Sequence, residues 1–159
     1  MNLGIVLHHL GHSQAAFYAI NQMNQHLSNA DWEHKNTGTL FYENSSHPCM
    51  DSEAAKMNLS RISDFRGTIV LTTLDQAETV LKIVNPSRKI LYLWDVEWIR
   101  NKQYLHNLSI LRSENLEIYC RSQYHADALM KYANIDVQGI CDNFNLAQLG
   151  IGERNEEAE

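Results

Sequence analysis

At 159 residues, the chain has room for one domain with a buried core and not for two. Hydrophobic residues make up 44% of the chain and charged residues 20%, which excludes a fibrous or extensively disordered protein. The formal net charge is −6, and no lysine or arginine cluster suited to a phosphate backbone is present, so no nucleic-acid partner is expected.

The sequence also predicts the cellular compartment and the bounds of the domain. No apolar run approaches the ~18–20 residues that cross a bilayer, and the amino-terminal segment lacks the basic flank of a signal peptide. The three cysteines have no C-x-x-C spacing, which is typical of a reduced protein rather than a disulfide framework. We therefore predict a cytoplasmic protein without a membrane span, with a single domain over residues 1–150 and an acidic, disordered tail over residues 151–159.

Strand-type and helix-type patterns alternate along the chain. The first strand is predicted over residues 3–8, and it is followed by a helix over residues 15–27 with apolar residues on one face and Ser13 as its N-cap. A second strand is predicted over residues 38–44. The stretch 45–65 has no clear period and receives no assignment.

A third strand is predicted over residues 67–73, followed by a helix over residues 74–84. Asp75 and Glu78 have the spacing of a capping box, and Val84 falls on the apolar face of this helix. The same alternation continues to the end of the domain, with strands predicted over 89–95, 115–122 and 136–141, and helices over 101–112 and 122–134. In the last helix, the residues spaced for burial are Ala126, Leu129, Met130 and Ala133.

The strand-type segments around residues 68–72 and 89–94 are apolar almost continuously, as in strands that are covered on both faces by helices. Parallel strands joined by helices cross over in the right-handed sense. The pattern therefore predicts a three-layer α/β/α Rossmann-like domain with a mostly parallel open sheet of about six strands. In such sheets, ligands bind outside the carboxyl ends of the strands.

Polar and aromatic side chains follow the predicted strands at this edge, as is typical of a sugar or nucleotide site. In chain order of the strands they are His8, His9, Gly11, His12 and Ser13; Glu43 and Asn44; Thr72 and Thr73; Trp94, Asp95, Glu97 and Trp98; Arg121 and Ser122; Asp142 and Asn143. The loop after the first strand lacks the G-x-G-x-x-G fingerprint, so no dinucleotide cofactor is predicted.

The histidine loop has three interpretations. Its imidazoles could bind a metal ion, one of them could act as a general base, or they could be polar residues at the start of a helix. A catalytic metal site needs at least three ligands, and the adjacent histidines His8 and His9 point to opposite faces of a strand. We therefore predict no metal site.

Two tryptophans flank two carboxylates after the fourth predicted strand. Trp94 and Trp98 could stack on the apolar face of a sugar while Asp95 and Glu97 accept hydrogen bonds from its hydroxyl groups. Alternatively, the tryptophans pack a helix against the sheet.

The segment "LEIYCRSQYHADALMKYANIDVQGICDNFNLAQL", residues 116–149, resembles the end of the amino-terminal half of GT-B glycosyltransferases. In that family, a serine opens a helix after a strand, as Ser122 does here, and the final strand runs into an N-G-V-D-like turn. Phe144 and Asn145 replace the glycine and the aspartate of that turn. The loop "HHLGHSQ" is similar to the acceptor-side loop of the family.

The resemblance implies a glycosyltransferase-type Rossmann domain in which His8, His9, His12 and Asp95 would bind the acceptor or act as base. The family's second domain, which holds the sugar nucleotide, has no counterpart in the sequence. We therefore expect a split or reduced glycosyltransferase that needs a donor-domain partner or a homo-oligomer. The alternatives are a non-catalytic ligand-binding or assembly module and, least favoured, a metal-dependent hydrolase.

Overall fold

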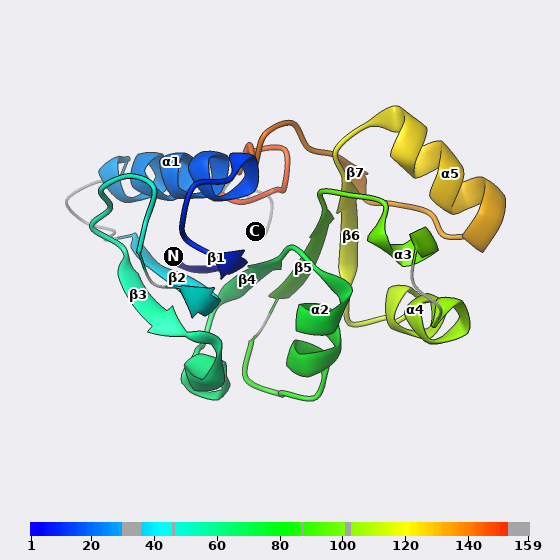
Figure 1. The fold of residues 1–159 in the computed structure, drawn as a ribbon, viewed down its shortest axis with the longest axis horizontal. Coiled ribbons are helices and arrows are strands. Elements are labelled where there is room, and N and C mark those ends of the chain that lie inside the picture. Colours follow the sequence, from blue (N-terminus) through cyan, green and yellow to red (C-terminus); the bar gives the residue numbers. More distant parts are fainter. Residues whose placement is uncertain (30–35, 46, 87, 101–102, 153–159) are drawn as a thin grey trace, which may run out of the picture.

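The computed structural model describes residues 1–29, 36–45, 47–86, 88–100 and 103–152. In this part of the chain, seven strands form one open sheet in the order β3-β2-β1-β4-β5-β6-β7, and every neighbouring pair is parallel (Figure 1). The strands are β1 (Asn2–His9), β2 (Thr37–Ser45), β3 (Ala55–Asn58), β4 (Thr68–Leu71), β5 (Arg88–Leu93), β6 (Glu117–Cys120) and β7 (Gly139–Ile140). The helices are α1 (Gln14–Ser28), the 3-10 helix η1 (Leu59–Asp64), α2 (Leu74–Leu81), α3 (Glu97–Arg100), α4 (Tyr104–Leu111) and α5 (Gln123–Ala133).

The Rossmann-like fold class is confirmed, with one strand more than the six expected. The additional strand is β3, in the stretch without a clear period. All four of its residues are exposed, because it lies at the edge of the sheet. Without a buried face it has no apolar alternation, which is the signal that identifies a strand in a sequence.

Alternate residues of the strands bury two separate clusters, one on each face of the sheet. On one face, Leu3, Ile5 and Leu7 of β1 share a cluster with α1 and with the segment 141–151. On the other face, Val6 shares a cluster with η1, α2, α4 and α5. The sheet is therefore the middle of three layers (Figure 1).

The chain changes faces between β1 and β4, which are neighbours in the sheet. The helix after β1 covers one face, and the helix after β4 covers the other. The two loops therefore leave the sheet in opposite directions, which opens a crevice at the carboxyl ends of these strands.

Two predictions about helix α2 are wrong in detail. The helix ends at Leu81, three residues before the predicted end, and Val84 is 92% exposed instead of buried. Its capping box is formed by Thr73 and Gln76 rather than by Asp75 and Glu78. Thr73 is extended and is therefore the true N-cap, so the pair that caps the helix lies two residues earlier.

The end of the domain also differs from the prediction. Met130 of α5 is 45% exposed rather than buried, whereas its neighbour Leu129 is fully buried. Ile151 is buried and donates its backbone N–H to the Leu146 carbonyl, so the packed part extends beyond residue 150. The remaining tail residues 153–159, like residues 101–102 of a predicted helix, lie outside the described residues. No helix in the described part is long and apolar enough to span a bilayer.

Candidate functional site

Three of the helices in the described part begin at the carboxyl edge of the sheet, and each is capped by a hydroxyl group. The side chains of Ser13, Thr73 and Ser122 accept hydrogen bonds from backbone N–H groups in the first turns of α1, α2 and α5, at distances of 3.1, 3.3 and 3.3 Å. The N-cap predicted for Ser13 is confirmed, as is the helix-opening position of Ser122. The positive ends of three helix dipoles consequently lie along one edge.

Two adjoining cavities at this edge share Trp94 and Asp95, and we call them together the carboxyl-edge groove. The first cavity, of about 240 Å³, lies at the crevice between β1 and β4. The second cavity, of about 430 Å³, lies at the amino end of α5. The predicted site residues in the first cavity are His8, His9, Ser13, Thr73, Trp94, Asp95 and Glu97. Those in the second cavity are Trp94, Asp95 and Ser122.

His8 is held by side chains from the neighbouring strand. Its Nδ1 lies 2.8 Å from Glu43 Oε2, and Asn44 Nδ2 lies near both ring nitrogens, 3.0 Å from Nε2 and 3.4 Å from Nδ1. Because a carboxylate only accepts, the neutral imidazole that fits the Glu43 contact carries its proton on Nδ1 and leaves Nε2 as an acceptor. Glu43 Oε2 also accepts a 3.3 Å hydrogen bond from Gln76 Nε2, so two side chains hold the same carboxylate oxygen.

Gln76 joins the first cavity to the loop after β4. Its side chain is fully buried, and its Oε1 accepts from the backbone N–H of Thr72 at 2.9 Å and of Thr73 at 3.2 Å. Thr72 Oγ1 in turn donates to the Val6 carbonyl at 3.0 Å. This network ties the ends of β1, β2 and β4 together and gives the cavity a rigid polar wall.

Glu97 occupies the amino end of α2. Its Oε1 accepts from the Leu74 backbone N–H at 2.7 Å, which places a carboxylate against the positive end of the helix dipole. Burial raises the pKa of Glu97, and Asp75, Asp95 and Glu43 raise it further, whereas the Leu74 hydrogen bond lowers it. The predicted role of Glu97 in ligand binding therefore competes with a structural role as a helix cap.

Trp94 lies in an aromatic cluster at the centre of the groove. Its ring stacks on Phe144 with centroids 5.3 Å apart, and the Arg121 guanidinium carbon lies 4.0 Å from its centroid. Tyr92 meets the ring edge-on at 5.7 Å. A sugar stacking on Trp94 would therefore have to displace Arg121 or use the edge of the indole.

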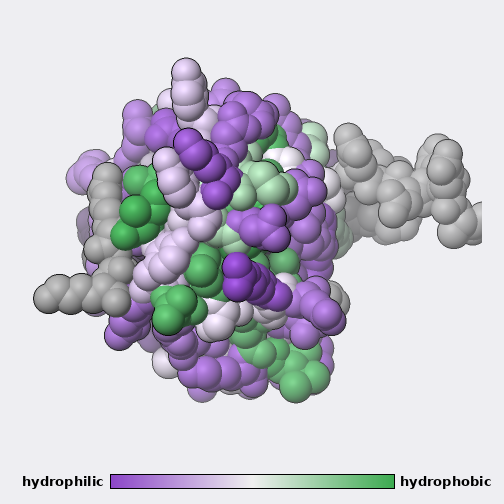
Figure 2. Space-filling model, turned by 90° about the vertical axis from the view of Figure 1, so that its right-hand side faces the viewer, coloured by the Kyte–Doolittle hydropathy of each residue, from purple (hydrophilic) through white to green (hydrophobic). Residues whose placement is uncertain are grey.

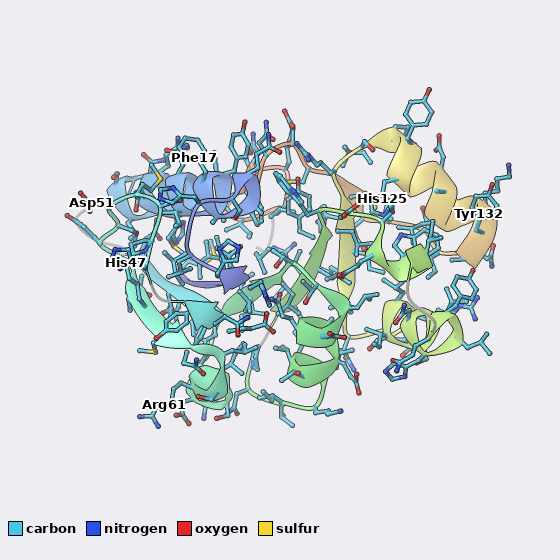
Figure 3. The ribbon with its side chains drawn as sticks, in the orientation of Figure 1. Phe17, His47, Asp51, Arg61, His125 and Tyr132 are labelled. Atoms are coloured by element: carbon cyan, nitrogen blue, oxygen red, sulfur yellow. The ribbon has the colours of Figure 1, made fainter. Side chains whose placement is uncertain are left out.

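Trp98 packs in the core, which is the second of the two roles, ligand stacking and packing, that the sequence allows. It is fully buried, and its Nε1–H donates to His125 Nε2 at 2.8 Å, which joins α3 to α5. Figure 3 shows His125 on the side of α5 that faces α3. Trp98 lines neither cavity, so the structure places it in the core and not among the residues of the groove.

Four other predicted residues lie outside the two cavities, and one of them, Glu43, is connected to the first cavity only through His8. His12 is exposed, and Gly11 lies beside His9 on the far part of the loop, because the chain turns away from the groove before α1. Asn143 has a φ of +48° in the turn after β7 and lines neither cavity. Within the described ranges, no three His, Cys, Asp or Glu side chains are grouped to hold a metal ion.

A larger cavity of about 470 Å³ lies at the opposite edge of the sheet, where β2 begins. It is lined by residues such as Thr37, Gly38 and Thr39, at the amino ends of the strands, where open α/β sheets do not bind ligands. The smaller cavities at the carboxyl edge, with their histidines, carboxylates and helix ends, are therefore the better candidate.

Sequence reasoning missed His125, which lines the second cavity, and Gln76, which binds Glu43 and the loop after β4 beside the first cavity. Both lie at the third position of a helix whose N-cap is a hydroxyl residue, where a side chain turns back toward the carboxyl edge. That position is readable from the sequence once the N-cap is placed correctly. The scan of protein families, the search of curated proteins and the search of solved structures each found no significant match to the chain.

Proposed function

We propose that this chain binds a sugar in the carboxyl-edge groove and acts as the acceptor-recognising half of a GT-B-type glycosyltransferase. The observation that carries the proposal is the grouping of the His8–Glu43 pair, Trp94 and Asp95 around the first cavity. A base, an aromatic surface and a carboxylate in one crevice are what a site needs to orient a sugar hydroxyl for reaction. The crevice lies where open α/β sheets bind their ligands.

His8 has the contacts of a general base. Glu43 accepts the Nδ1–H of the neutral imidazole, which leaves Nε2 as an acceptor. An acceptor hydroxyl would bind at Nε2 and pass its proton to this nitrogen. Its oxygen would then bond to the anomeric carbon of the donor as the bond from that carbon to the leaving diphosphate breaks.

The turn after β7 gives separate support to the family resemblance. The GT-B turn has a glycine at the position of Phe144, and Phe144 has a φ of +61°, in the left-handed region that glycine favours. The phenylalanine is nonetheless fully buried against Tyr92 and Trp94. Aromatic packing therefore offsets the backbone strain at this position.

All described strands belong to one sheet, so the donor site would come from outside this sheet. The groups that stabilise the leaving diphosphate would then lie in a donor-side domain, for example in a partner protein or a second copy of the chain.

The test is calorimetric titration of the chain with neutral mono- and disaccharides, using wild type, His8→Ala and a matched control. His106→Ala is the control, because His106 also pairs with a glutamate, Glu78, at 3.1 Å but lies on α4 outside the groove. We expect saccharide binding that His8→Ala weakens by about tenfold and that His106→Ala leaves unchanged. Absence of saccharide binding, or equal effects of the two variants, would contradict the proposal.

A non-catalytic assembly module is the second candidate, favoured by apolar side chains exposed on α4 and α5. Leu105 is 81% exposed and Tyr132 is 63% exposed. Figure 2 shows this end of the molecule, where apolar residues form small patches separated by hydrophilic ones. Self-association in sedimentation experiments, together with sugar binding but no transfer in the presence of donor sugars, would favour this candidate.

A further inference from the structure

We propose that the second cavity of the carboxyl-edge groove is an oxyanion subsite, which holds a phosphate group carried by the ligand. The inference rests on the proposed function in that both use one groove, and it narrows the ligand from a neutral sugar to a sugar phosphate. Its support comes from backbone groups, from one buried side chain and from one cation.

The backbone contribution comes from the first turn of α5. The N–H groups of Gln123 and Tyr124 precede the first intrahelical hydrogen bonds, and no acceptor within the described residues binds them. The first turn also contains no acidic residue. At α2, by contrast, the Glu97 carboxylate binds the corresponding N–H of Leu74. The amino end of α2 therefore binds a carboxylate of the chain, whereas no carboxylate of the described residues binds the amino end of α5.

The second and independent observation is His125, which lines this cavity and is only 6% exposed. Its Nε2 accepts from Trp98, and an indole N–H can only donate, so the proton of the neutral imidazole must be on Nδ1. Nδ1 has no partner among the described residues, and it is not one of their fully buried unpaired atoms. Solvent therefore reaches Nδ1, and because His125 lines the second cavity we place this donor there, where it can bind an acceptor of the ligand.

Arg121 supplies the charge. Its guanidinium lies over Trp94 at 4.0 Å, at the wall of the second cavity, and its donors can bind two phosphate oxygens at once. Ser122 adds a hydroxyl group beside it. Asp95 also lines this cavity, would repel an anion and acts electrostatically on His125, so the phosphate belongs beside Arg121, Ser122 and the first turn of α5, with His125 donating from its edge.

The two cavities share Trp94 and Asp95 and therefore adjoin, and we place one ligand molecule across both. A sugar in the first cavity, near His8, would carry its phosphate toward α5. The two ends of the groove would then bind different groups: sugar hydroxyls at the first cavity and phosphate oxygens at the second.

The experiment is a titration of the ¹⁵N-labelled chain with inorganic phosphate at constant ionic strength, followed by amide and imidazole spectra. We expect saturable shifts at the amides of Gln123, Tyr124 and His125 and at the Nδ1–H of His125. Arg121→Gln should weaken phosphate binding by about tenfold. Lys131→Gln, which removes the same charge at the other end of α5, should leave it unchanged.

Acetate is titrated in parallel, because a sugar acid presents similar oxygens. Binding of acetate without phosphate would overturn the phosphate assignment. Equal effects of the two charge variants, or no saturable shifts with phosphate, would overturn the subsite itself. Neutral saccharides test the proposed function separately: sugar binding without phosphate binding refutes only this inference, and phosphate binding without sugar binding refutes only the proposed function.

Discussion

The hydrogen bond between Trp98 and His125 requires a neutral imidazole. The indole N–H donates to His125 Nε2 in a buried position, and a protonated imidazole would have two donors facing each other there. Burial lowers the pKa of His125, and the Asp95 carboxylate partly offsets this shift. Folding therefore holds His125 in the form that joins α3 to α5.

This hydrogen bond makes the unfolding free energy depend on pH. A histidine whose pKa is lower in the folded state takes up its proton more readily in the unfolded chain, so the unfolding free energy decreases as pH falls below 6.5. His125→Gln keeps an acceptor for Trp98 and removes the titrating group. We expect a smaller decrease between pH 7 and pH 5 in this variant than in wild type, measured by urea unfolding at each pH.

His12→Gln is the control, because His12 is exposed. His26 is present in every variant, and burial lowers its pKa too, so part of the decrease should persist. The same pH dependence in wild type and His125→Gln would show that His125 does not titrate as described.

For single residues, the sequence patterns predicted which residues lie at the carboxyl edge better than which way their side chains point. They placed Asp95, Trp94 and Ser122 at the correct edge, because the position after a parallel strand determines that edge. They could not separate Trp94, which lines the groove, from Trp98, which is buried four residues later. That difference depends on the short helix α3 and on its partner His125, which lies far away in the sequence.

The elements that shape the groove are the helices that start at its rim, and α2 has the most complete cap. Thr73 accepts from the Gln76 backbone, the Gln76 side chain binds the Thr73 backbone, and Glu97 binds Leu74. Three of the N–H groups at this end of α2 are thus satisfied by side chains. The helix has only eight residues, so its stability depends on this end.

We expect Thr73→Ala to lower the unfolding free energy by about 1 kcal/mol, because it removes the cap hydroxyl. Thr79→Ala is the matched control: it deletes the same atoms from an exposed position of the same helix, where Oγ1 binds the Asp75 carbonyl. Urea unfolding of the three proteins measures the difference. If the two variants are equally stable, the capping hydrogen bond contributes nothing measurable.

Element boundaries were predictable where a buried face was long. Strands β1 and β2 lie within one residue of their predicted bounds, and each has a buried run, over residues 3–7 in β1 and 38–41 in β2. Strand β3 was missed because it is exposed, and β7 is only two residues long against a predicted run of six. The end of α2 was misplaced because Val84 continued the apolar period although its side chain faces solvent.

At the scale of the whole molecule, the reversal between β1 and β4 determines where a ligand site can form. Alternating strand and helix patterns predict a parallel sheet, but the same pattern fits several strand orders. The order, and with it the pairing of His8 with Glu43 across neighbouring strands, depends on contacts between segments far apart in the sequence. The fold class was therefore predictable, whereas the composition of the groove was predictable only as a set of strand ends.

The most direct test of this account is the map of amide shifts when the ¹⁵N-labelled chain is titrated with hexose phosphates. We predict shifts at residues 8–9, 13, 72–73, 94–97 and 121–125, which line or flank the carboxyl-edge groove. Shifts centred on residues 36–39 and Glu53, around the larger cavity at the opposite edge, would contradict it. Unchanged spectra at saturating hexose phosphate would contradict it equally.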